Sequence, residues 1–192
     1  MCSSDLEAVT EIIGAARGMR MMMTPIRSSR QDLLDTCGTG GDGSGTFNIS
    51  TATAIVTAAC GVPTAKHGNR KITSATGSAD VLACLGVGIE ADRACVERCL
   101  DELGLCFCFA PMLHPAMKHV GQVRRQLGVP TLFNYLGPLC NPAGASYQVI
   151  GTGREDLQTK LAAALVHLQT QGAIVVRGQD GMDEVSLSAE TS

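Results

Sequence analysis

The chain has 192 residues, a formal net charge of −3, 45% hydrophobic and 17% charged residues, and 3% aromatic residues with no tryptophan. This length can bury a sizeable core, while the acidic balance and scarce aromatics argue against a broad polyanion-binding face or a base-stacking surface. The sequence lacks an apolar run of about 18 residues and a signal-peptide layout, so we expect a cytoplasmic protein that binds neither nucleic acid nor membrane.

The first predicted element is an amphipathic helix from residue 5 to about residue 20. Its apolar residues fall on one helical face and are Leu6, Val9, Ile12, Ile13, Ala16 and Met19. The polar segment "TPIRSSRQD" follows. We interpret this helix as a packing or interface element.

From Leu33 onward, predicted strands and helices alternate. Strands are expected at 62–66, 105–109, 147–151 and 173–177, and helices at 51–60, 78–85, 92–103, 115–127 and 154–168. This alternation predicts an α/β fold with a largely parallel sheet flanked by helices, preceded by a helical portion.

The stretch "DTCGTGGDGSGTFNIST" has the G-x-G-x-x-G spacing at Gly38, Gly40 and Gly43. Such glycines let backbone N–H groups approach a phosphate. A dinucleotide-binding turn also needs a helix that opens at the glycines and an acidic residue about 20 residues further on. Both are missing here, since the next helix is expected only with Ser50 or Thr51 as its N-cap.

A basic cluster follows the glycine stretch. Between Gly43 and Ala79 there is no Asp or Glu, whereas Lys66, Arg70 and Lys71 lie there together with His67. A glycine stretch alone is as consistent with a simple turn as with a phosphate loop. The added basic cluster favours a local anion-binding surface.

Nine cysteines, an odd number, suggest reduced thiols rather than a disulfide framework. One alternative is a zinc site, whose ligands would be Cys95, Cys99, Cys106, Cys108 and His114. No C-x-x-C pair occurs, and "LCFCF" alternates like a strand, so we favour apolar packing of these cysteines.

Four segments share one explanation: "GTGGDGSGTFNIST", "KHGNRKITSATGSAD", "VRRQLGVPTLFNYLGPLCNPAG" and "DGMDEVSLS". In this order they resemble the anthranilate phosphoribosyltransferase family. These enzymes of tryptophan biosynthesis join anthranilate to phosphoribosyl pyrophosphate and release pyrophosphate. The resemblance extends from about Leu6 to the end, although "KITSAT" departs from the serine-rich family version.

The resemblance implies a small helical domain and a larger α/β domain with the active site between them. Residues 1–27 would be a remnant of the helical domain, and 28–192 a phosphoribosyl pyrophosphate-binding domain truncated at its C-terminus, with about 112–140 packing with the helical domain. It also implies a homodimer through the helical domain. Since family members continue beyond both ends, we expect an internal fragment that is inactive alone.

The resemblance also implies the site residues. Those for phosphoribosyl pyrophosphate are Gly38, Gly41, Asp42, Thr46, Asn48, Ile49, Ser50, Thr51, Lys66, His67, Gly68, Asn69, Arg70, Lys71, Ile72, Thr73, Ser74 and Ser78. Those for anthranilate are Gly38, Asn69 and Arg124, and those for Mg²⁺ are Ser50, Asp183 and Glu184.

Elementary chemistry agrees with these roles. Pyrophosphate suits backbone N–H groups together with Lys66 and Arg70. The three carboxylates Asp42, Asp183 and Glu184 would repel pyrophosphate unless Mg²⁺ binds carboxylate and phosphate oxygens together.

For the acceptor, Arg124 offers a forked donor to the anthranilate carboxylate, whereas a helix would turn the adjacent Arg125 about 100° away. His67 is either a general base or a hydrogen-bonding and packing residue, and we favour the second. No side chain needs to be the nucleophile, because the anthranilate amine attacks the ribose carbon itself.

Two rivals remain at this point. A pyrimidine nucleoside phosphorylase would share the fold, but its glycine loop differs and its monophosphate substrate gives no reason for Asp183 and Glu184. A noncatalytic nucleic-acid-binding relative would carry a broad basic surface and lose the substrate residues, whereas this chain is acidic and keeps Asn69 and Arg124.

Overall fold

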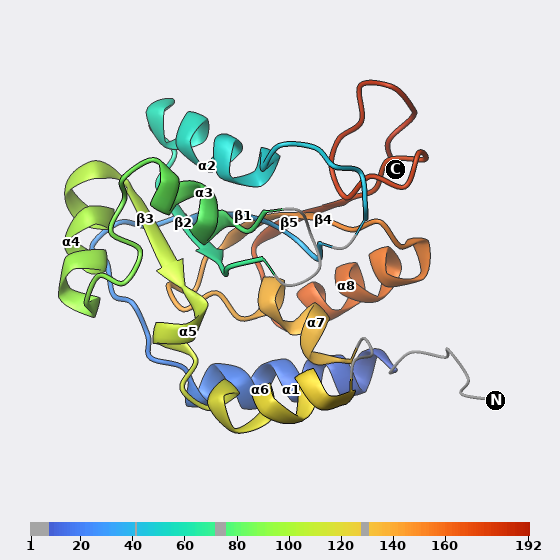
Figure 1. The fold of residues 1–192 in the computed structure, drawn as a ribbon, viewed down its shortest axis with the longest axis horizontal. Coiled ribbons are helices and arrows are strands. Elements are labelled where there is room, and N and C mark those ends of the chain that lie inside the picture. Colours follow the sequence, from blue (N-terminus) through green and yellow to red (C-terminus); the bar gives the residue numbers. More distant parts are fainter. Residues whose placement is uncertain (1–7, 41, 72–75, 128–130) are drawn as a thin grey trace.

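A computed structural model describes residues 8–40, 42–71, 76–127 and 131–192, with the backbone alone described for 122–125 and 127. Five parallel strands form one sheet in the order β3-β2-β1-β4-β5 (Figure 1). They are β1 (Leu34–Gly38), β2 (Thr64–Gly68), β3 (Leu105–Phe109), β4 (Tyr147–Gly151) and β5 (Gly172–Val176). The predicted α/β class with a largely parallel sheet is confirmed.

The central strand, β1, is absent from the predicted strands. Its sequence "LDTCG" contains a buried Asp35 and Thr36 and runs directly into the glycine stretch. Polar residues followed by glycines are typical of loops. The strand forms because both of its edges pair with neighbouring strands, which a local pattern does not reveal.

Helices cover both faces of the sheet. In Figure 1, α2 (Ile49–Ala59) and α8 (Glu155–His167) lie on opposite sides of it, and α1 (Val9–Met22) lies beyond α8. The remaining helices are α3 (Ser78–Cys84), α4 (Arg93–Leu103), α5 (Ala110–Leu113), α6 (Met117–Leu127), α7 (Phe133–Leu136) and η1 (Gly137–Leu139). The short α5, α7 and η1 are additions to the predicted helices, because one helical turn leaves no periodic signal.

The main core lies between α1, α7, η1, α8 and β4. Leu157, Leu161 and Leu165 recur every four residues of α8, and all three are buried. From α1, Ile12 and Ala16 pack into the same cluster. The described part of the N-terminal helix therefore uses the predicted apolar face, and Leu6 lies outside the described residues.

Both ends of α2 are fixed by specific contacts. At its start, the N-cap is Asn48, whose Oδ1 accepts from Thr51 N–H at 3.0 Å. The expectation that Ser50 or Thr51 caps this helix is wrong, because the helix begins earlier. At its end, Thr57 Oγ1 lies 3.2 Å from Thr64 Oγ1 at the start of β2.

The cysteines of the described chain are free thiols, and Cys106 and Cys108 are buried in the core with their Sγ atoms 3.9 Å apart. Over the same residues, no group of three or more His, Cys, Asp or Glu is arranged to hold a metal ion. Nor do the described residues include a helix long and apolar enough to cross a membrane.

Candidate active site

A cavity of about 310 Å³ opens at the carboxyl ends of the strands. The connection after β1 leads to β2 on one side, and β4 lies on the other side of β1. Ligands of open α/β sheets bind where the strand order reverses in this way. The topology thus places a binding site beside the glycine stretch that follows β1.

Most predicted site residues line this cavity: Gly38, Asp42, Thr46, Asn48, Ile49, Ser50, Lys66, His67, Gly68, Asn69, Arg70, Ser78, Asp183 and Glu184. Thr51 and Lys71 do not line it. Gly41, Ile72, Thr73 and Ser74 lie outside the described residues, as does the side chain of Arg124. The cavity adds residues that the prediction omitted, namely Cys37, Thr39, Gly40, Gly43, Ser44, Gly45, Phe47, Thr76 and Gly77.

Two glycines explain the start of the phosphate-loop pattern. A Cβ atom on Gly38 would lie 2.7 Å from Asp183 Oδ2, so a side chain there would push the Asp183 carboxylate from its present position. Gly40 has φ +67°, a left-handed conformation that glycine adopts at low cost. Its N–H donates to Asp183 Oδ2 at 2.9 Å. These glycines therefore bring the loop against the acidic segment near residue 183.

The N-terminus of α2 points its first residues at the cavity. Ile49 and Ser50 line it, and Ser50 Oγ accepts from Lys66 Nζ at 3.1 Å. Free N–H groups and the helix dipole favour an anion at such an end. The Thr51 hydroxyl, in contrast, is buried and has no hydrogen-bond partner among the described residues.

Lys66 and Asp35 are charged residues in the interior of the sheet. Lys66 is 2% exposed and Asp35 is 0% exposed. Burial lowers the pKa of Lys66 and raises that of Asp35, while the attraction between the two charges opposes each shift. Lys66 Nζ also donates to Thr36 O. The Lys66 ammonium therefore reaches the cavity from the interior of the sheet and is held there by β1.

The His67 ring is fully engaged with protein atoms. Its Nδ1 lies 3.0 Å from Gly137 O, so Nδ1 carries the proton and donates. Its Nε2 lies 3.1 Å from His114 Nε2. Burial is the main cause that lowers the pKa of each imidazole to about 4. This geometry agrees with the favoured hydrogen-bonding and packing role, and a part for His67 in proton transfer stays untested.

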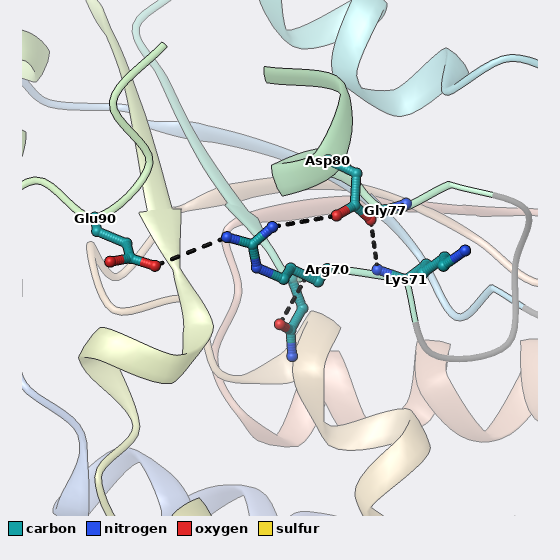
Figure 2. Close-up of polar contacts among 6 residues, drawn as sticks. Arg70, Lys71, Gly77, Asp80 and Glu90 are labelled. Carbon is teal, nitrogen blue, oxygen red and sulfur yellow. Dashed lines mark hydrogen bonds and ion pairs between the residues drawn. The ribbon is translucent and has the colours of Figure 1, made fainter. Parts of the chain in front are cut away.

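Arg70 stands at the edge of the cavity and is already paired with carboxylates. Figure 2 shows Arg70 between Asp80 and Glu90, with ion-pair distances of 3.5 and 3.7 Å. Asp80 Oδ2 also accepts from the backbone N–H groups of Lys71 and Gly77, and these bonds hold its pKa below the usual value. The stretch without acidic residues in sequence therefore has acidic neighbours in space.

Sequence reasoning missed these acidic neighbours. Asp80 lies three residues after the N-cap of α3, Gly77, which is the spacing of a helix-capping acid. That signal was available in the sequence, whereas Glu90 comes from a separate connection and carries none.

Three carboxylates, those of Asp42, Asp183 and Glu184, line the same cavity as Lys66 and Arg70. Burial and then repulsion from Asp183 raise the pKa of Glu184 to about 7. Burial and then Asp42 raise the pKa of Asp183. The Ser50 backbone N–H and the charge of Lys66 act on Glu184 in the opposite direction. Such mutual repulsion is relieved when a cation binds between the groups.

The parallel sheet, the glycine loop and the carboxylates meet at the strand-order reversal, which is where open α/β domains place a ligand site. Residues 30–192 match the model of the glycosyl transferase family, a/b domain, and the chain belongs to this family.

The chain is 64% identical over 186 residues to an anthranilate phosphoribosyltransferase of Rhodopirellula baltica, covering 97% of this chain and 54% of that protein. It is 54% identical to the Pelotomaculum thermopropionicum enzyme of the same name, covering 95% and 53%. The predicted resemblance is confirmed. The chain spans about half the length of these relatives.

Solved structures agree. The anthranilate phosphoribosyltransferase of Thermus thermophilus superposes with a TM-score of 0.88 at 49% identity, covering 94% of this chain and 54% of that one. The Saccharomyces cerevisiae enzyme, in complex with phosphoribosyl pyrophosphate and Mg, gives 0.86 at 33% identity, covering 93% and 50%.

Proposed function

We propose that the protein containing this chain transfers the phosphoribosyl group from phosphoribosyl pyrophosphate to the amine of anthranilate in tryptophan biosynthesis. The observation that carries the proposal is one cavity that unites a glycine loop, a helix N-terminus, a buried lysine and an acidic pair. The named activity of the relatives supports the same reaction.

The phosphate-binding half of the site consists of fixed donors. Backbone N–H groups at the start of α2 and the Lys66 ammonium line one side of the cavity. Because these donors are held before a ligand arrives, they cost little reorganisation when charge develops on the departing pyrophosphate. Arg70 can join them only by weakening its pairs with Asp80 and Glu90.

The acidic half fits a divalent cation. Asp183 and Glu184 have raised pKa values because they are buried and because they repel one another and Asp42, and no lysine or arginine forms an ion pair with them in the described chain. Mg²⁺ binds through one or two carboxylates plus phosphate oxygens and water, so these residues, with the Ser50 hydroxyl, suit it. When bound, Mg²⁺ would neutralise charge on the pyrophosphate.

The acceptor half of the site rests on fewer described atoms. Gly38 and Asn69 line the cavity, and Asn69 Oδ1 accepts from Arg70 N–H at 2.8 Å. The role of Arg124 in holding the anthranilate carboxylate stays a prediction, as does the homodimer. These residues bind and orient the amine toward the ribose carbon, so that positioning supplies much of the rate.

Two measurements test this proposal, each on the chain and on a protein completed with the flanking segments of the Rhodopirellula baltica relative. Calorimetry should show that phosphoribosyl pyrophosphate binds only with Mg²⁺, and that Asp183→Asn with Glu184→Gln weakens binding. The completed protein should consume anthranilate, seen as loss of its fluorescence. Equal binding with and without Mg²⁺ would contradict the metal assignment, and a folded completed protein without turnover would contradict the reaction.

A further inference from the structure

Strands β1 and β2 pair regularly only at their beginning. Their register is the single pair Leu34 with Thr64, whereas the β1–β4 and β2–β3 registers each run over five pairs. In a regular parallel ladder continued from that pair, Thr36 N–H would donate to Ala65 O and His67 N–H to Thr36 O. The strands therefore separate toward the end that faces the cavity.

Side chains occupy the main-chain groups that the separation frees. His67 N–H donates to Asp35 Oδ1 at 3.0 Å, and Thr36 O accepts from Lys66 Nζ. One carboxylate and one ammonium thus replace a single ladder hydrogen bond. Buried main-chain groups need such partners, so this charged pair satisfies the two strands while keeping them apart.

A third side chain completes the separation. Asn141, which is 5% exposed, donates through Nδ2 to Ala65 O at 2.7 Å, and its Oδ1 accepts from Ala143 N–H at 2.8 Å. The Ala65 carbonyl oxygen, which would accept from Thr36 N–H in a regular ladder, is therefore also bonded to a side chain. Asn141 lies in the connection that leads to β4, so this segment also helps to keep β1 and β2 apart.

The burial of Asp35 at this position is energetically unfavourable. It is fully buried, and its Oδ2 has no hydrogen-bond partner among the described residues. Asp35 and Lys66 attract each other but form no direct ion pair among the described residues, so the desolvation of the two charges is poorly compensated, and an unpaired buried oxygen adds to the cost. The arrangement is therefore poorly explained by stability alone.

Its geometric effect is on the cavity. Asp35 does not line the cavity, but His67, whose N–H it holds, continues into Gly68 and Asn69, which do. If the ladder closed, His67 N–H would approach Thr36 O and compete there with Lys66 Nζ. Both Lys66 and the 67–69 backbone would then shift from their present positions.

We propose that Asp35 is a positioning residue, which holds β1 and β2 apart through the His67 N–H and so places Lys66 and the 67–69 backbone for the phosphorylated ligand. This inference rests on the proposed function, because the ligand used to test it is phosphoribosyl pyrophosphate. It assigns a role to a residue that contacts no substrate.

The test compares Asp35→Asn with Leu161→Ala, which creates a cavity in the separate core cluster around α8. Both variants lose stability, so calorimetric titration with phosphoribosyl pyrophosphate and Mg²⁺ is done at a temperature where circular dichroism shows each to be folded. It uses the 192-residue chain and the completed protein. Asp35→Glu, which keeps the charge but moves it by one methylene, is the second variant if Asp35→Asn does not fold.

We expect Asp35→Asn to weaken binding by about tenfold, since the charge-assisted hydrogen bond to His67 N–H becomes a neutral one, while Leu161→Ala binds like the unaltered protein. Amide exchange at His67 and Asn69 should accelerate in the Asp35 variant alone. Unchanged binding in the Asp35 variant, or equal losses in both variants, would overturn the inference. If the unaltered protein itself does not bind, the proposed function fails instead.

Discussion

Lys66 and Arg70 lie four residues apart at the same cavity, yet their charges are held in opposite ways. Lys66 is 2% exposed and donates to Thr36 O and Ser50 Oγ. The Arg70 side chain is 52% exposed, pairs with two carboxylates and lies with Cζ 5.8 Å from the ring centre of Phe109.

The contrast separates a buried cluster (Asp35, Lys66 and His67) from a surface cluster (Arg70, Asp80 and Glu90). Water screens the surface charges, so each pair contributes little and can exchange partners when a ligand arrives. Removing one buried charge leaves another without compensation. The same kind of charge therefore has a fixed role in one cluster and an exchangeable one in the other.

The largest effect should come from breaking the buried cluster. Lys66→Met should lower the free energy of unfolding by about 3–5 kcal/mol, because Asp35 remains buried without its counter-charge. Urea denaturation measures this, with the exposed Lys118→Met as the control. Asp35→Leu combined with Lys66→Met should cost much less than Lys66→Met alone. If Lys66→Met lowers the free energy of unfolding by less than about 1 kcal/mol, the buried and surface clusters do not differ in this way.

The next effect is a pH dependence of stability from the buried imidazoles. The pKa of His67 is about 4 in the fold against an ordinary 6.5, so the unfolded chain binds more protons between these values. The contribution of His67 to stability should therefore fall as pH drops from about 7 to 4, by on the order of 3 kcal/mol, while the raised pKa of Glu184 acts in the opposite direction. Thermal melts of His67→Gln should lose less stability toward pH 4 than those of the unaltered protein, whereas the exposed His119→Gln should keep the original profile.

A smaller effect should come from the helix that begins beside the buried cluster. Asn48→Ala removes the side-chain acceptor for Thr51 N–H and should cost about 1 kcal/mol. Thr51→Val, which removes a buried hydroxyl that has no hydrogen-bond partner in the described part of the chain, should be neutral or stabilising in the ligand-free protein. Denaturation midpoints measure the stability of both variants. A larger loss of stability for Thr51→Val than for Asn48→Ala would mean that Thr51, and not Asn48, is the important residue at this helix start.

The smallest effect should come from the surface cluster. Arg70→Gln should change the free energy of unfolding by less than about 1 kcal/mol, and added salt should shrink the difference further. Denaturation at low and high ionic strength measures both. A loss as large as that of Lys66→Met would mean that the exposed pairs are not screened.

The fold was largely predictable because its helices and most of its strands carry clear periodicities. The strands expected at 105–109 and 147–151 match β3 and β4. Strand β1 escaped prediction because its buried polar residues, Asp35 above all, contradict the apolar pattern of a central strand. These residues are buried because they form hydrogen bonds with β2. Those contacts join segments that are distant in sequence, so a local sequence pattern does not reveal them.

The site was predictable as a set of segments but not as a network. The glycine loop and the acidic pair were found through the motif resemblance. The partners of Arg70 were not, because Glu90 comes from a separate part of the chain and Asp80 lies just beyond the acid-free stretch. The direction of the His67 ring depends on Gly137 and His114, which are 70 and 47 residues away in sequence.

Helix α2 is fastened at both ends, by Asn48 beside the cavity and by Thr57 against the start of β2. Deleting one residue between them would turn one end by about 100° relative to the other and shorten the helix by about 1.5 Å. Either the Thr57 contact or the direction of Ser50 toward Lys66 would be lost. Evolution can therefore vary the exposed side chains of α2, such as Ile55 and Val56, far more freely than it can vary the number of residues in it.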